Sequence, residues 1–127
     1  MKNGNLSGGW KDGKSKVTIN LPVMSFEENE VHIAYIPVLD LSGYGKNEQE
    51  ALSSLTITLN DYFSYTTIKN TLIEDLEAHG WTIRKKTKPY IAPELTDLIN
   101  KNEYLHDIVN SRNYKMSRMD VNMPELV

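Results

Sequence analysis

Apolar and polar residues alternate along the chain from residue 17, and this alternation predicts a β-strand. From Val17 to Val23 every second residue is apolar, and the residues between them are polar or Pro22. Successive side chains of a strand point to opposite faces of a sheet, so a period of two is typical of a half-buried strand. Because proline donates no backbone hydrogen bond, Pro22 favours an edge position for this strand or an outward-facing nitrogen.

Two further strands are predicted directly after the first. The polar turn at residues 27–30 leads into an apolar run over residues 31–36, which favours an antiparallel hairpin. Pro37 ends this run. A third, short strand is expected around residues 41–46, after a bulge or bend at residues 37–40.

Helical periodicity begins after these strands. Asn47 and Glu50 have the spacing of a capping box, in which each of the two side chains accepts a hydrogen bond from the backbone N–H of the other residue. The helix that follows is expected to end near Ser64. Its predicted apolar stripe consists of Ala51, Leu55, Leu59 and Tyr62, with Leu52 and Phe63 beside it.

A second, shorter helix and a fourth strand are expected next. Thr71 and Glu74 repeat the capping-box spacing, and Gly80 stands where a helix favours a left-handed residue after its end. Alternation returns over residues 81–86, where Trp81 is expected to point inward.

The remainder of the chain is predicted to be mainly helical. Pro93 suits the first position of a short helix, and a second helix is expected over about residues 102–111. A strand-like segment over residues 116–123 then stops at Pro124.

Together these elements predict an α+β fold in three parts. A three-to-four-stranded, mainly antiparallel sheet packs on a capped helix in the order β-β-β-α-α-β, and two short helices and a terminal strand follow. Residues 1–15 are expected to form a flexible arm, because they offer little apolar surface to bury. Residues 16–88 form the α+β domain, and residues 89–127 form a helical appendage with the terminal strand.

Composition supports one ordinary globular unit. The chain has 127 residues and a formal net charge of −3, which gives no overall support for binding to a phosphate backbone. The absence of cysteine excludes disulfides, thiolate metal sites and thiol nucleophiles. No apolar run is long enough to span a membrane and the first residues have no signal-peptide core, so we expect a cytoplasmic protein.

Candidate catalytic chemistry is sparse. The three histidines, His32, His79 and His106, lack metal-ligand spacing, and neither a metal nor a cofactor is expected. Asp40 lies at the predicted bend, where a carboxylate-metal nuclease is one alternative, but Asp61 and Asp75 fall on outward helical positions. No catalytic residue is assigned, and the chain is not expected to be an enzyme.

A basic run follows the predicted fourth strand and is the candidate nucleic-acid contact. Such a run also keeps an exposed strand edge soluble, so both interpretations stay open. The residues are Arg84, Lys85, Lys86 and Lys88.

The segment 39–51 resembles the HicB antitoxin family. Members typically show a Pro-Asp-Leu-Pro-Gly-like turn, a short strand, and Gly-x-Thr-x-x-Glu-Ala at the helix start. Ser42 replaces the usual proline here, and the connection to the helix is shorter. The resemblance covers about residues 16–86 and is carried by Leu39-Asp40-Leu41-Ser42-Gly43 and by Gly45-Lys46-Asn47-Glu48-Gln49-Glu50-Ala51.

This resemblance implies a truncated RNase H-like fold without nuclease chemistry. HicB-like domains bind and mask a small RNase toxin of the HicA type and tend to self-associate. They often carry a DNA-binding module, which is not recognisable in this chain. We therefore expect a non-catalytic protein-binding domain, an antitoxin or an orphan descendant of one. A homodimer is also expected, because a small sheet with helices on one side needs cover on its other face.

Masking a basic RNA-binding face would require an acidic surface. Charge alone singles out two clusters, one in the first turn and one in the second helix. They consist of Glu27, Glu28 and Glu30, and of Glu74, Asp75 and Glu77.

Overall fold

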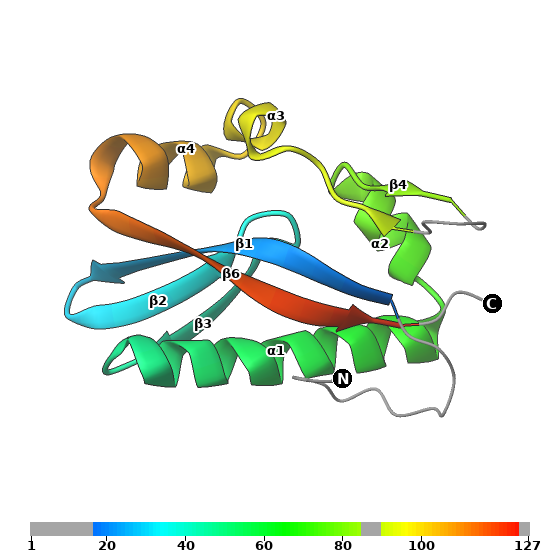
Figure 1. Ribbon diagram of the computed structural model, residues 1–127, viewed down its shortest axis with the longest axis horizontal. Helices are drawn as coiled ribbons and strands as arrows, with labels where there is room; N and C mark the ends of the chain where they lie inside the picture. Colours follow the sequence, from blue (N-terminus) through cyan, green and yellow to red (C-terminus); the bar gives the residue numbers. More distant parts are fainter. Residues whose placement is uncertain (1–16, 85–89, 125–127) are drawn as a thin grey trace.

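A four-stranded antiparallel sheet forms the centre of the computed structural model, which describes residues 17–84 and 90–124. In chain order its strands are β1 (Val17–Glu28), β2 (Val31–Ile36), β3 (Leu41–Gly45) and β6 (Tyr114–Met123). Across the sheet the order is β3-β2-β1-β6. The first three strands form two successive hairpins, whereas β6 comes from the far end of the chain (Figure 1).

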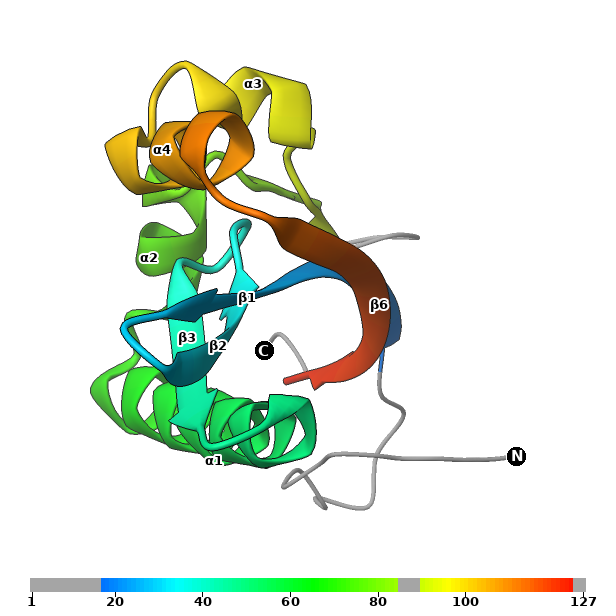
Figure 2. The same ribbon diagram turned by 90° about the vertical axis from the view of Figure 1, so that its left-hand side faces the viewer.

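Helices cover both faces of this sheet (Figure 2). The long α1 (Glu48–Lys69) lies on one face, and α4 (Glu103–Ser111) lies on the other beside the short α3 (Leu95–Ile99). At one end are α2 (Leu72–Ala78) and a two-stranded sheet of β4 (Thr82–Ile83) and β5 (Tyr90–Ile91). The predicted α+β class and element order are confirmed. Among the described residues no helix is both long and apolar enough to cross a bilayer.

Two clusters of buried side chains result from this layering. The larger lies between the sheet, α1 and α2, and includes Phe63, Leu76 and Trp81. The face that was expected to need a second copy of the chain is covered by the chain's own α4. The smaller cluster lies between this face of the sheet and α4. It consists of Met24, Phe26, Ile33, Tyr35, Leu105 and Ile108.

The terminal strand belongs to the central sheet. β6 pairs with β1 over its 10 residues, and Val121 and Met123 join the larger core. Within the described part of the predicted fourth strand at residues 81–86, Thr82 and Ile83 form β4, which pairs with β5 outside this sheet; residues 85 and 86 lie outside the described residues. Pro22 lies where β1 pairs with β6 alone, because the pairing with β2 begins at Met24. One side of Pro22 therefore has no neighbouring strand among the described residues, as expected.

The start of α1 follows the predicted cap with one change. The side-chain oxygen of Asn47 accepts a hydrogen bond from the backbone N–H of Glu50 at 2.9 Å. The Glu50 carboxylate accepts from the backbone N–H of Lys46 at 2.9 Å, one residue before the predicted donor. Both side chains still satisfy N–H groups at the helix start.

The predicted end of α1 near Ser64 is wrong, because the helix continues to Lys69. Thr66 is buried, and its hydroxyl donates to the backbone carbonyl of Tyr62 at 2.8 Å. Packing of this threonine against the core outweighs its low helix propensity. The helix ends at Asn70, which has a left-handed φ of 60°.

α2 lacks the predicted capping box but ends as expected. The Thr71 side chain makes no capping hydrogen bond. Gly80 has a φ of 94°, and its N–H donates to the carbonyl of Glu77 at 3.0 Å. The N–H of Trp81 donates to the carbonyl of Leu76 at 3.0 Å, which completes a Schellman motif.

The late helices are close to their predicted positions. The side chain of Asn102 caps α4 by accepting from the backbone N–H of Leu105 at 3.0 Å. α3 has Glu94 as its N-cap, so Pro93 precedes the cap rather than occupying the first helical position.

Two glycines let α1 pack directly on β3. A Cβ at Gly43 would lie 2.2 Å from the backbone nitrogen of Leu55 and 2.4 Å from the carbonyl oxygen of Ala51. A Cβ at Gly45 would lie 2.4 Å from the Cβ of Glu50. The atoms closest to Gly43 belong to the helix backbone, which cannot move aside in the way that the end of a flexible side chain can. The close contact between α1 and β3 therefore requires a glycine at position 43.

The substitution Gly43→Ala is expected to lower the free energy of unfolding by about 3 kcal/mol, because α1 must shift away from β3. Urea unfolding followed by circular dichroism measures the change. Ser42→Ala, next to it on β3, is the matched control and is expected to change this free energy by less than about 1 kcal/mol. Equal effects of the two substitutions would contradict the proposed close contact.

The β1–β2 hairpin turns through two residues with positive φ. Asn29 has a φ of 53° and Glu30 a φ of 68°, which together form a type I′ turn. Asparagine tolerates this conformation, whereas the Cβ of glutamate opposes it.

Glu30→Gly is therefore expected to raise the free energy of unfolding by about 0.5–1 kcal/mol. Glu30→Ala removes the same carboxylate but keeps a Cβ, so it should give no such gain. Thermal unfolding of both variants tests the explanation. If alanine stabilised as much as glycine, loss of charge rather than relief of strain would be the cause.

Candidate functional site

The two predicted acidic clusters lie at opposite ends of the molecule, at the β1–β2 hairpin and at α2 (Figure 1). In the hairpin the Glu28 carboxylate accepts a hydrogen bond from Arg112 at 2.6 Å, so its charge is compensated. The Glu27 carboxylate lies 3.7 Å from the Nδ1 of His32, and Glu30 is exposed. The structure therefore does not unite the six predicted residues in one site.

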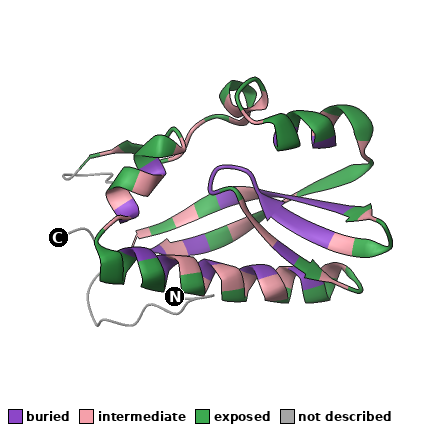
Figure 3. Cartoon of the chain, turned by 180° about the vertical axis from the view of Figure 1, so that it is seen from behind, coloured by how far each residue is buried: buried purple, intermediate pink, exposed green. Residues whose placement is uncertain are grey.

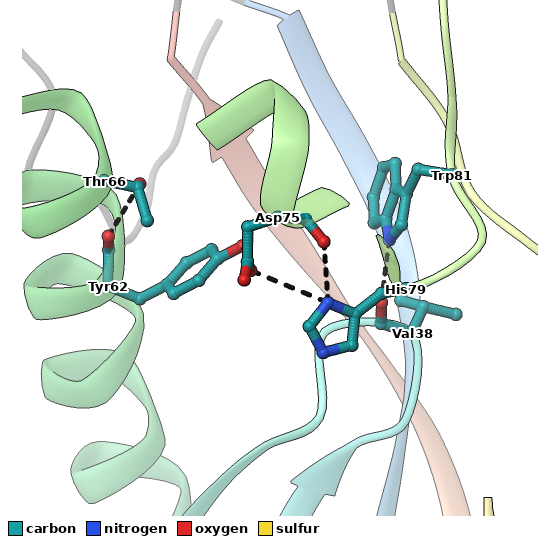
Figure 4. Close-up of polar contacts among 6 residues, drawn as sticks. All are labelled: Val38, Tyr62, Thr66, Asp75, His79 and Trp81. Carbon is teal, nitrogen blue, oxygen red and sulfur yellow. Dashed lines mark hydrogen bonds and ion pairs between the residues drawn. The ribbon is translucent and has the colours of Figure 1, made fainter. Parts of the chain in front are cut away.

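The acidic residues of α2 have three different environments. Asp75, expected to point outward, accepts a hydrogen bond from the hydroxyl of Tyr62 on α1 (Figure 4). The Nδ1 of His79 lies 2.8 Å from the backbone oxygen of Asp75 and 3.6 Å from its carboxylate. Burial, and the hydrogen bond to Asp75, raise the pKa of Tyr62. Glu74 is exposed, whereas Glu77 lines a cleft.

An acidic cleft is a feature that the sequence did not predict. It has a volume of about 1080 Å³ and lies between the bend after β2, the end of α2, the segment leading into α3, and the start of α4. Five carboxylate residues line it, with two residues that can carry positive charge. The carboxylates are Asp40, Glu77, Glu94, Asp97 and Glu103, and the others are His79 and Lys101.

Most of this negative charge has no ion-pair partner within residues 17–84 and 90–124. Four of the carboxylates form no ion pair with another described residue: Glu77, Glu94, Asp97 and Glu103. Like charges that line a cleft with low-dielectric walls focus the electric field and raise the local concentration of cations. The cleft is therefore suited to a positively charged ligand.

A chain of hydrogen bonds holds one wall of the acidic cleft. Asp40 has a positive φ of 55°, and its carboxylate accepts from the buried hydroxyl of Tyr35 at 2.6 Å. The same hydroxyl accepts from the side-chain amide of Asn102, the cap of α4, at 2.9 Å. Burial, and the hydrogen bond to Asp40, raise the pKa of Tyr35. The bend and α4 are thereby fixed to each other.

The end of α2 is tied to the same bend. After the turn at Gly80, the indole nitrogen of Trp81 donates to the backbone oxygen of Val38 at 2.7 Å (Figure 4). The Trp81 ring also contacts the ring of Tyr90 edge-on, with 6.4 Å between centroids. The Schellman motif therefore places Trp81 where it joins α2, β5 and the bend.

The remaining predicted sites are only partly described. Arg84 is exposed after β4, whereas Lys85, Lys86 and Lys88 lie outside the described residues, so the nucleic-acid alternative stays a prediction. Asp40 is engaged by Tyr35, and within residues 17–84 and 90–124 no group of His, Asp and Glu is arranged to hold a metal ion.

Sequence reasoning missed Glu94, Asp97 and Glu103. These carboxylates are dispersed along the chain and converge with Asp40 and Glu77 only through the fold. The one local signal was their place at or near the starts of two predicted helices. Acidic residues are favoured there because they stabilise the helix, so this signal does not by itself indicate a binding site.

Comparisons with known proteins add no function to this site. No protein-family model, curated protein or solved structure matches the chain. The resemblance of segment 39–51 to HicB antitoxins stays a prediction.

Tyr35→Phe is expected to lower the free energy of unfolding by about 1–2 kcal/mol, because Asp40 and Asn102 lose their shared partner. Tyr44→Phe is the control, since Tyr44 is 57% exposed. Urea unfolding of both variants provides the comparison. Equal stability of the two would show that the hydrogen bonds through Tyr35 contribute nothing measurable.

Proposed function

We propose that this chain is a non-catalytic protein-binding domain of the HicB antitoxin type whose acidic cleft binds a basic segment of a partner protein. The observation that carries the proposal is a set of four carboxylates in one cleft that form no ion pair with another described residue. Complementary charge accelerates association and favours the correct partner over others.

The other residues of the cleft support an occupant with long cationic side chains. Apolar groups lie between the carboxylates, among them Pro37, Ile91 and Leu98. Lysine and arginine can pack their aliphatic stems on such groups while their charged ends reach carboxylates. A small inorganic cation would make no use of this apolar surface.

The resemblance to HicB antitoxins suggests a small RNase toxin as the source of this basic segment. An RNA-binding face is basic because it must contact phosphates. Binding of that face to the acidic cleft would exclude RNA by steric overlap and by charge compensation. The mechanism requires no chemical step in this chain.

The hairpin carboxylates are the weaker candidate for this contact. Glu28 is already paired with Arg112, and Glu27 lies close to His32. Among the described residues the hairpin therefore offers fewer carboxylates without an ionic partner than the acidic cleft does.

Two matched variants distinguish these surfaces. The cleft variant carries Glu77→Lys and Asp97→Lys, and the hairpin variant carries Glu27→Lys and Glu30→Lys, so both change the net charge equally. Each tagged full chain is used to capture partners from native lysate, followed by quantitative mass spectrometry. We expect wild type and the hairpin variant to recover a small basic protein, and the cleft variant to recover at least about tenfold less, as charge reversal removes the attraction.

The captured protein must also behave as a masked RNase. We expect it to degrade RNA in isolation and to lose this activity when wild-type chain is added, with less inhibition at high salt. Undiminished capture by the cleft variant would contradict the proposal. Salt-sensitive binding of RNA or DNA that is abolished by reversal of Lys85 and Lys86 would favour the nucleic-acid alternative.

A further inference from the structure

The outer face of α1 carries the most exposed large apolar side chains of the described residues. Ile57 is 62%, Tyr65 63% and Ile68 81% exposed. Helical spacing places them off the stripe of buried residues of α1. Figure 3 shows that exposed and half-buried positions follow the outer side of this helix. Tyr65 and Ile68 are three residues apart and therefore neighbours on the helix surface, and adjacent exposed apolar groups favour an interaction surface.

Charged residues give this face a self-complementary pattern. Asp61, Tyr65 and Lys69 are spaced by four residues, so they lie on one ridge of the helix. Asp61 and Lys69 form no ion pair with any residue in the described part of the chain. The Lys69 ammonium lies 5.9 Å from the centroid of the Tyr65 ring.

We propose that the outer face of α1 binds a second copy of this chain, with the two α1 helices antiparallel about a two-fold axis beside Tyr65. Because Asp61 and Lys69 are equally far from Tyr65 in opposite directions, this axis places Asp61 of each copy opposite Lys69 of the other. The two Tyr65 rings meet at the axis, and Ile68 of each copy is covered by the opposing helix.

Charge complementarity selects a second copy in this orientation. A two-fold interface uses the same patch on both molecules, so the patch must complement itself. A parallel arrangement would place Asp61 against Asp61 and Lys69 against Lys69, which is repulsive. The antiparallel arrangement converts all four charges into two ion pairs.

This inference is independent of the proposed partner. The outer face of α1 lies on the side of the molecule away from α3 and α4, which border the acidic cleft (Figure 1). Self-association on α1 therefore leaves the cleft accessible, and either surface can fail its test without affecting the other.

Light scattering coupled to size-exclusion chromatography of the full chain tests the inference. Wild type is expected to reach a mass of twice 14.5 kDa as its concentration rises. Asp61→Lys alone and Lys69→Asp alone each create like-charged pairs, so both should remain monomeric at concentrations where wild type is dimeric. The double variant restores opposite charges and should regain the dimer.

Three controls keep the result interpretable. Circular dichroism shows whether each variant is folded, and Lys101→Asp reverses a charge at the acidic cleft and should remain dimeric. Ile68→Ser removes an apolar contact from a side chain that is 81% exposed, so it should weaken the dimer without unfolding the chain.

Several outcomes would overturn the inference. These are a wild-type chain that stays monomeric at all concentrations, single charge reversals that remain dimeric, or a folded double variant that stays monomeric. Loss of the dimer in Lys101→Asp would likewise place the interface elsewhere.

Discussion

The direct contact between α1 and β3 determines where most other parts of the molecule lie. With no Cβ at Gly43, the helix backbone rests on the strand backbone and the direction of α1 is fixed. Tyr62, near the far end of the helix, then meets Asp75 of α2, and the turn after α2 brings Trp81 back to Val38. The acidic cleft forms around these connections, so its position depends on a contact on the other side of the sheet.

Features determined by neighbouring residues were predicted well, whereas features determined by distant ones were not. Alternation identified β1, and a polar turn followed by an apolar run identified β2. The local signals at Asn47 and Gly80 correctly marked a helix start and a helix end. The extension of α1 through Thr66 escaped prediction, because its cause is burial against the core rather than propensity. The strand-like segment near the end of the chain was predicted but its neighbour was not, since nothing local specifies the pairing with β1.

The same difference between neighbouring and distant residues explains why the sequence did not predict the acidic cleft. Clusters of charge in the sequence drew attention to the hairpin and to α2, but Glu28 of the hairpin is paired with Arg112 and Glu27 lies close to His32. The acidic cleft gathers Asp40, Glu77 and Glu103 from segments far apart in the chain. Only the fold brings such residues together, so a count of neighbouring charges in the sequence cannot reveal the field that they create.

The pairing of β6 with β1 has a consequence for how the protein is made. A ribosome synthesises β1 first and β6 last among the described strands, and chains begin to fold from their N-terminal side. Until β6 emerges, half of β1 has no partner and the core lacks Val121 and Met123. Formation of the native sheet therefore waits for the last strand, and a nascent chain stalled before β6 presents an unpaired, apolar strand to chaperones and proteases.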